Sequence, residues 1–142
     1  MRVKDKVRVA QVDDTRAQVF IAENKYAQAE ATARSAARSF KKARRQCLSA
    51  ETLVNQGIAL ARMRQPAGAQ FILREPIETA HQAGALDRAG LAARIMIEEI
   101  DALAREIQTV AYEQAKDWLA SSGSPDIKPR LRAVRKKLTP WH

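Results

Sequence analysis

Apolar side chains recur at spacings of three and four residues along most of the chain, which is the period of one face of an α-helix. Residues 26–40 show the pattern most simply, in the row Tyr26, Ala29, Ala33, Ala36 and Phe40. Similar rows follow in residues 53–61, 69–80, 87–100 and 103–119. The pattern predicts an all-α fold. The presence of only five glycines and five prolines in 142 residues agrees, because both residues weaken helix interiors.

Short segments between these rows predict where helices begin and end. Breaks are expected at residues 23–25, at residues 64–66 and at Gly84, and the first helix is expected to begin near Asp13 and Asp14 or a few residues earlier. Residues 98–101 contain neither glycine nor proline, so residues 87–120 form either one long helix or two, the second capped by Asp101. Pro76 lies inside the fourth row and predicts a kink or a restart, because an interior proline costs about 3 kcal/mol.

A clear breaker, Ser-Ser-Gly-Ser-Pro, occupies residues 121–125. Beyond it, apolar residues recur at four, three and four positions and predict a short amphipathic helix that Pro140 ends: Ile127, Leu131, Val134 and Leu138. We therefore expect a helical repeat domain in residues 1–120, a linker in residues 121–126 and a basic tail helix in residues 127–142.

The rows resemble the tetratricopeptide repeat, a family of antiparallel helix pairs stacked as a solenoid. Its first helix has a small residue and then an aromatic, and its second has Tyr, Ala, an aromatic and Ala. The first pair here matches in all but the second aromatic: Ala17, Phe20, Tyr26, Ala29, Ala33 and Ala36. The second pair matches at Gly57 and Ala69 but has Pro76 in place of an alanine. Ala17 and Gly57 are 40 residues apart, against a family period of about 34, so extended first helices are expected.

Residues 12–18, 57–62 and 77–80 look like the helical domain of certain bacterial regulators with tetratricopeptide-like pairs. Those regulators also carry a C-terminal helix-turn-helix of the inversion-factor type. The resemblance covers roughly residues 8–120 and implies a protein-interaction scaffold in a regulatory protein. The helix-turn-helix has no counterpart before His142, so a shortened member or a fragment is expected.

In the tetratricopeptide family, the first helix of each pair lines a groove that binds peptides. The resemblance implies these groove residues: Asp14, Gln18, Ile21, Asn55, Ile58 and Arg62. A subgroup grips a carboxylate with five basic or amide residues, of which only Asn55 and Arg88 are matched here, and Asp14 would repel a carboxylate. We expect an extended or helical segment of a partner protein, held by mixed polar and apolar contacts without such a clamp. The alternative is that these side chains simply face solvent.

The net charge of +9 is unevenly distributed. Six cations and no acid follow residue 127, and we take them as candidate phosphate contacts: Lys128, Arg130, Arg132, Arg135, Lys136 and Lys137. A second cluster of five cations spans Arg38 to Arg45. Nucleic-acid association through the two clusters is the alternative function. In the other interpretation of the tail, which we prefer, its apolar stripe caps the open end of the solenoid.

Nothing in the sequence indicates catalysis, a metal or a cofactor. His81 and His142 are the two histidines, and no triad or ligand set assembles around them. Cys47, the only cysteine, excludes an internal disulfide. We expect a non-enzymatic protein without cofactors, located in the cytoplasm because neither a secretory signal nor an apolar segment of about 20 residues is present. Self-association through an unpaired terminal helix face stays open.

Overall fold

The computed structural model describes the chain except for residues 1, 102, 121, 123 and 139–142. The described residues form seven α-helices and no strand: α1 (Val3–Ala22), α2 (Tyr26–Lys42), α3 (Gln46–Arg62), α4 (Pro66–Gln82), α5 (Leu86–Glu99), α6 (Arg105–Trp118) and α7 (Ile127–Leu138). The prediction of an all-α fold is therefore confirmed. Pro140, Trp141 and His142 lie outside the described residues.

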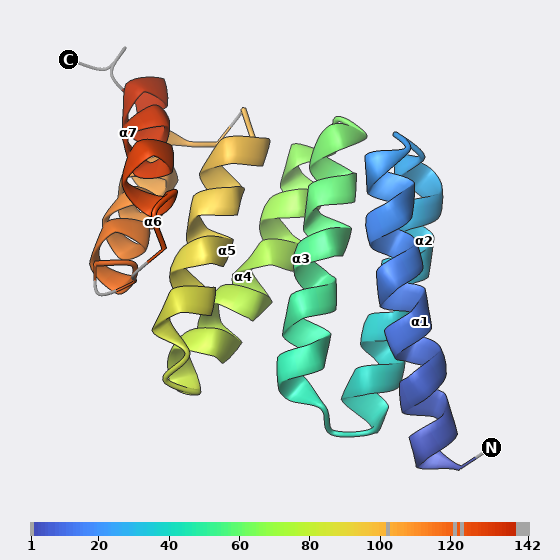
Figure 1. The fold of residues 1–142 in the computed structure, drawn as a ribbon. Coiled ribbons are helices and arrows are strands. Elements are labelled where there is room, and N and C mark those ends of the chain that lie inside the picture. Colours follow the sequence, from blue (N-terminus) through green and yellow to red (C-terminus); the bar gives the residue numbers. More distant parts are fainter. Residues whose placement is uncertain (1, 102, 121, 123, 139–142) are drawn as a thin grey trace.

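The helices stack as antiparallel pairs. Each helix from α1 to α6 packs against the next, α1 also contacts α3, and α3 also contacts α5. As a result α1, α3 and α5 form one layer and α2, α4 and α6 form the other (Figure 1). The predicted solenoid of stacked helix pairs is thus observed, and α7 lies on α5 and α6 at its C-terminal end.

Four turns between these helices repeat at intervals of 20 residues. Each has one residue with a positive φ: Asn24, Arg44, Arg64 and Gly84. In each turn a backbone N–H donates back to a carbonyl five residues earlier, as Lys25 N does to Phe20 O at 2.8 Å and Ala85 N to Ala80 O at 2.8 Å. Such bonds satisfy carbonyls that a helix end leaves without partners.

Small residues allow the two helices of a pair to lie close together. Ala17 is fully buried on α1. Gly57 on α3 faces the Leu73 side chain of α4, and Gly90 on α5 faces Leu119, the residue after α6. Four of the five buried residues of α2 are alanines, whereas α4 buries one alanine and three larger side chains, so α2 relies most on close backbone approach.

The structure corrects the predicted start of the first helix. α1 begins at Val3, about ten residues before Asp13 and Asp14, which lie in its middle. The physical reason is tertiary packing: Ala10 joins a buried cluster with Phe40 of α2, and Val7 packs against that cluster. The stabilisation from this burial outweighs the local preference for acidic residues at a helix start.

Two further expectations concern Asp101 and Pro76. Residues 87–120 do form two helices, but Asp101 is not the cap, because α6 begins at Arg105 after Ala104. The break follows an extended backbone at Ile100. No restart occurs at Pro76, since α4 runs unbroken from Pro66 to Gln82. The proline side chain is fully buried, and this burial offsets part of the lost hydrogen bond.

Candidate functional site

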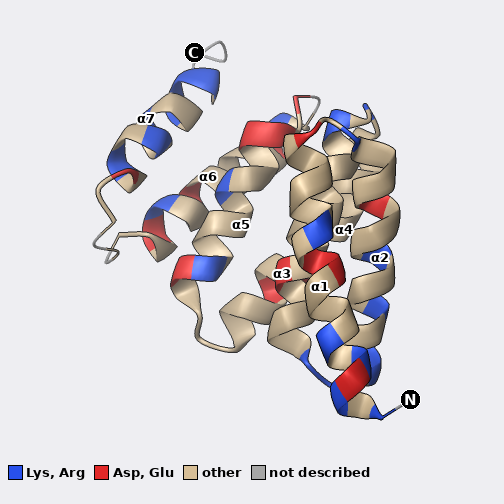
Figure 2. Cartoon of the chain, turned by 45° about the vertical axis from the view of Figure 1, so that its right-hand side comes forward, with Lys and Arg blue, Asp and Glu red and all other residues tan. Residues whose placement is uncertain are grey.

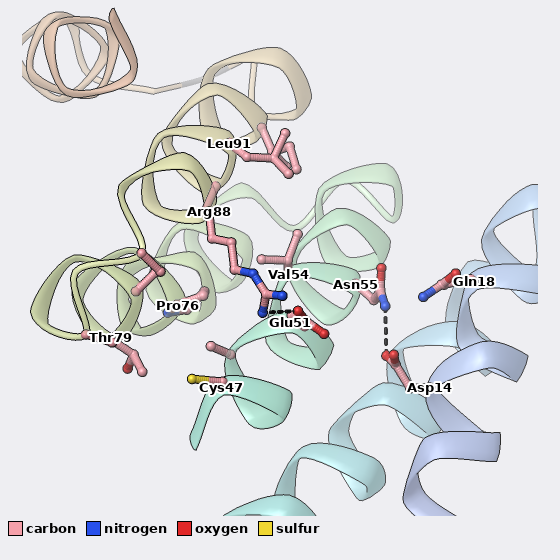
Figure 3. A pocket seen from close by; sticks show the side chains of 16 residues that line it. Asp14, Gln18, Cys47, Glu51, Val54, Asn55, Pro76, Thr79, Arg88 and Leu91 are labelled. Carbon is pink, nitrogen blue, oxygen red and sulfur yellow. Dashed lines mark hydrogen bonds and ion pairs between the residues drawn. The ribbon is translucent and has the colours of Figure 1, made fainter. Parts of the chain in front are cut away.

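A cavity of about 660 Å³ lies across α1, α3 and α5 and extends to the second half of α4. Its walls come from 16 residues, among which carbon atoms of Ala50, Val54, Leu91, Ala92 and Ile95 form an apolar floor. Figure 3 shows two of these side chains, Leu91 from α5 and Val54 from α3. Clefts of this volume with a largely apolar lining and a few polar groups are typical binding sites.

Three of the six residues predicted to line a groove do line this cavity. Asp14 and Gln18 come from α1, and Asn55 comes from α3. Asn55 Nδ2 donates to Asp14 Oδ1 at 2.8 Å, so the two polar residues satisfy each other across the groove (Figure 3). This contact joins positions 41 residues apart and also ties α1 to α3.

The other three predicted residues, Ile21, Ile58 and Arg62, lie outside the lining of this cavity. Ile21 and Ile58 are half-buried. Arg62 donates twice to Glu99 of α5, from Nε to Oε2 at 3.1 Å and from Nη2 to Oε1 at 2.9 Å. The hydrogen bonds from Arg62 to Glu99 raise the pKa of the guanidinium above its ordinary value. Arg62 therefore links α3 to α5 beyond the groove.

The two residues that match a carboxylate clamp are both engaged by acids. Arg88 forms an ion pair with Glu51 across the cavity, which Figure 3 shows beside the pair of Asn55 and Asp14. A ligand carboxylate would have to compete with Glu51 for Arg88 and would meet Asp14 at Asn55. The geometry thus offers no concentration of positive charge for an anionic group.

Sequence reasoning missed the apolar floor of the groove. Leu91 belongs to the apolar row in residues 87–100, and its side chain is exposed in the cavity wall. Cys47 is also exposed and lines the cavity. No local signal distinguishes Leu91 from core positions of its helix, because it follows the same helical period.

The stripe of the tail helix packs on the end of the stack. Ile127 joins the main core, with Leu131 packed against it. Val134 joins a smaller cluster with Tyr112 of α6, and Leu138 packs against that cluster. This packing agrees with the capping interpretation of α7, because it covers the open faces of α5 and α6.

Several of the six tail cations hold α7 in place. Lys137 Nζ donates to two carbonyls at the end of α5, Ile97 O at 2.8 Å and Glu98 O at 3.0 Å, and also lies 2.9 Å from Asp101 Oδ1. The hydrogen bond from Lys137 lowers the pKa of the Asp101 carboxyl below its ordinary value. A cation at this position compensates both the unpaired carbonyls and the negative end of the helix dipole.

The remaining tail cations lie as follows. Arg130 Nη2 lies 3.3 Å from Glu98 Oε1. The guanidinium of Arg135 lies over the Tyr112 ring, 5.8 Å from its centroid. Lys128 and Arg132 are exposed, and so is Lys136, which has an interaction of its own. Phosphate binding by the tail would therefore compete with contacts that attach α7 to the stack.

Arg94 is the one buried cation among the described residues, with only 3 % of its surface exposed. Its Nε lies 3.4 Å from Glu98 Oε1, without the geometry of a hydrogen bond. Burial lowers the pKa of the Arg94 guanidinium, and the charge of Glu98 opposes this effect. Glu98 thus stands between Arg94 of its own helix and Arg130 of α7.

No constellation for metal chemistry appears in the described part of the chain, where no group of three or more His, Cys, Asp or Glu side chains could hold an ion. His81 of α4 stacks on Trp118 of α6 with 4.7 Å between ring centroids. None of the described helices combines the length and apolar character needed to span a bilayer.

Comparisons with known proteins add nothing to this geometry. No protein-family profile, no curated protein and no solved structure matches the chain.

Proposed function

We propose that the chain is a non-catalytic, tetratricopeptide-like scaffold that binds a segment of a partner protein in the groove across α1, α3 and α5. The supporting observation is the cavity of about 660 Å³, which touches the first helix of all three pairs. The resemblance to the tetratricopeptide family assigns ligands to this same surface. A role inside a bacterial regulatory protein belongs to the proposal and rests on the resemblance alone. A location in the cytoplasm also belongs to the proposal.

The ligand chemistry follows from how the groove residues are paired. Asp14 with Asn55 and Glu51 with Arg88 already satisfy each other, so a ligand gains little by replacing these contacts. The apolar floor around Val54 is the surface left to bury. Covering one leucine-sized side chain contributes roughly 1.5–3 kcal/mol. We therefore propose a helical or extended segment with two or three apolar anchors, and polar side chains facing solvent.

The tail gives weaker support to nucleic-acid association. Arg130 and Lys137 bind the end of α5, and Arg135 lies on Tyr112. Displacing them would detach α7 from the stack. We therefore do not propose the tail as a phosphate-binding site.

Peptide selection followed by a groove variant tests the scaffold proposal. Random peptides displayed on phage are selected against the whole chain, and their affinities are measured by fluorescence anisotropy. Val54→Glu places a carboxylate on the apolar floor and should weaken binding at least tenfold, a loss of about 1.4 kcal/mol or more. Ala31→Glu, on an exposed position of α2, is the matched control and should bind like the wild type.

Two results would contradict the groove. One is that no peptide is enriched. The other is that the selected peptides bind Val54→Glu as tightly as the wild type. A peptide whose binding disappears above roughly 0.3 M salt would point to charge rather than to the apolar floor.

A further inference from the structure

The N-terminal end of the stack combines high positive charge with exposed apolar side chains. Residues 2–8 hold four cations and one acid, and residues 38–45 hold five cations and no acid. Together they carry +8, whereas the whole chain carries +9. We call these two segments the basic end. Figure 2 shows Lys and Arg gathered where α1 begins.

The fold brings the two segments together. A groove of about 340 Å³ between the start of α1 and the end of α2 is lined by Val3, Lys6 and Val9 on one side and by Ser39, Lys42 and Ala43 on the other. Val3 and Val9 are 61 % and 50 % exposed. The two valines give the groove an apolar floor, and Lys6 and Lys42 lie beside it. Within the described residues neither lysine forms an ion pair, so both are free to bind an acidic partner.

The two ends of the solenoid differ in whether a further helix covers them. α7 covers α5 and α6 at the C-terminal end, whereas in the described part of the chain no helix covers the outer side of α1. Val12 and Val19 also stay exposed on α1, one heptad apart and therefore on one face. An uncovered end of a helical stack is an available packing surface for another helix.

One helix of this chain has the complementary surface. On α6, Glu106, Val110, Glu113 and Asp117 lie at spacings of four, three and four and therefore share one face, which we call the acidic face. Val110 is 56 % exposed at its centre. Glu113 has only a distant partner, with Lys116 Nζ 4.0 Å away. Among the described residues, Glu106 and Asp117 form no ion pair.

We propose that the basic end of one copy binds the acidic face of a second copy, with Val110 seated between Val3 and Val9 and carboxylates near Lys6 and Lys42. Two basic ends cannot pair with each other, because that would place +8 against +8. Phosphate groups would satisfy the cations but would leave the valines uncovered. An apolar centre with acids around it satisfies both features.

The contact joins two different surfaces, so a single contact leaves one basic end and one acidic face free on the pair. Each added copy presents a new free surface, and the average mass should keep rising with concentration. The basic end and the acidic face lie outside the lining of the cavity of about 660 Å³. The contact is therefore independent of the proposed peptide groove, and Val54→Glu should leave it unchanged.

Charge reversal with rescue tests the proposal. Sedimentation of the whole chain in about 20 mM salt should show an average mass above 15.8 kDa that rises with concentration and returns to 15.8 kDa in about 0.5 M salt. Lys6→Glu with Lys42→Glu, and separately Glu106→Lys with Glu113→Lys, should each weaken association about tenfold or more. Mixing the two double variants should restore it, because each reversed surface then meets its complement.

Arg74→Glu, an exposed position on α4 outside both surfaces, is the control and should associate like the wild type. Circular dichroism of every variant checks that the helices are retained. A chain that stays at 15.8 kDa in low salt at about 1 mM overturns the proposal. Association that survives either double reversal, or that is not restored by mixing, overturns it too. If the chain does not associate but binds a labelled DNA duplex in a manner lost with Lys6→Glu and Lys42→Glu, the basic end is a nucleic-acid site instead.

Discussion

Replacing Gly57 by alanine should destabilise the chain, although alanine is the better helix former. A Cβ atom at Gly57 would lie 2.5 Å from Leu73 Cγ and 2.6 Å from Leu73 Cδ2. Carbon atoms in contact prefer about 3.5–4.0 Å, so the overlap is about 1 Å. Leu73 is fully buried in the main core and has little room to move away.

The expected magnitude is the difference of two effects. Alanine gains about 1 kcal/mol over glycine inside a helix. Overpacking a filled core typically costs about 1–3 kcal/mol and occasionally more. With an overlap of this size we expect the cost to be at the upper end, and the free energy of unfolding to fall by about 1–2 kcal/mol. For a chain of this length the Tm should fall by roughly 3–7 °C.

Thermal and urea unfolding followed by circular dichroism measure this effect. Gly68→Ala is the matched control, because its Cβ would lie 3.8 Å from the nearest Leu60 atom, an ordinary contact. It should raise the free energy of unfolding by up to about 1 kcal/mol. In a Leu73→Ala background the obstructing atoms are gone, and Gly57→Ala should then be stabilising. A Gly57→Ala chain as stable as Gly68→Ala would refute the close packing of α3 on α4.

Three further predictions concern single contacts. Gly84→Ala should cost about 1–2 kcal/mol in unfolding free energy, because φ is +75° and no atom meets the added Cβ within 4 Å; an unchanged urea midpoint would contradict this. Glu98→Gln should lower the free energy of unfolding by about 2 kcal/mol or more, because it leaves the buried charge of Arg94 uncompensated. Arg94→Met removes that charge and should lower the free energy of unfolding by less. Equal losses of the two variants in urea unfolding would refute the role of the charge. Lys137 holds the pKa of Asp101 in the folded state below 3.8. The ion pair therefore stabilises the fold fully above about pH 5, and this stabilisation is lost as the pH falls through the lowered pKa. Hydrogen exchange should show α7 amides less protected at pH 3 than at pH 6 after correction for intrinsic rates, and Asp101→Asn should reduce this difference.

Helix positions were largely predictable, since they depend on a local period. The turns were only partly predictable from the sequence. Asn24 and Gly84 are residue types that favour a positive φ, but Arg44 and Arg64 adopt the same backbone without any such signal. Packing of the flanking helices must offset the cost of about 1–2 kcal/mol at each arginine. A purely local interpretation therefore missed the turn at Arg44.

The candidate site was predictable in outline but not in detail. The family resemblance pointed to α1 and α3 as groove helices, and Asp14, Gln18 and Asn55 do line the cavity. The resemblance could not show that Asp14 accepts a hydrogen bond from Asn55, nor that Glu51 occupies Arg88. Both pairs depend on the offset between neighbouring helices, which single rows of residues do not contain.

The sequence by itself determined that this protein is helical, where most of its helices lie and that its tail is amphipathic, because these properties arise from residues three or four positions apart. Only the tertiary structure decided that Lys137 closes the end of α5, that Glu98 serves two arginines and that residues 2–8 meet residues 38–45. These contacts join positions that are far apart in the chain. They form only once the helices have stacked, since stacking sets which charged and apolar faces are covered and which remain available to a partner.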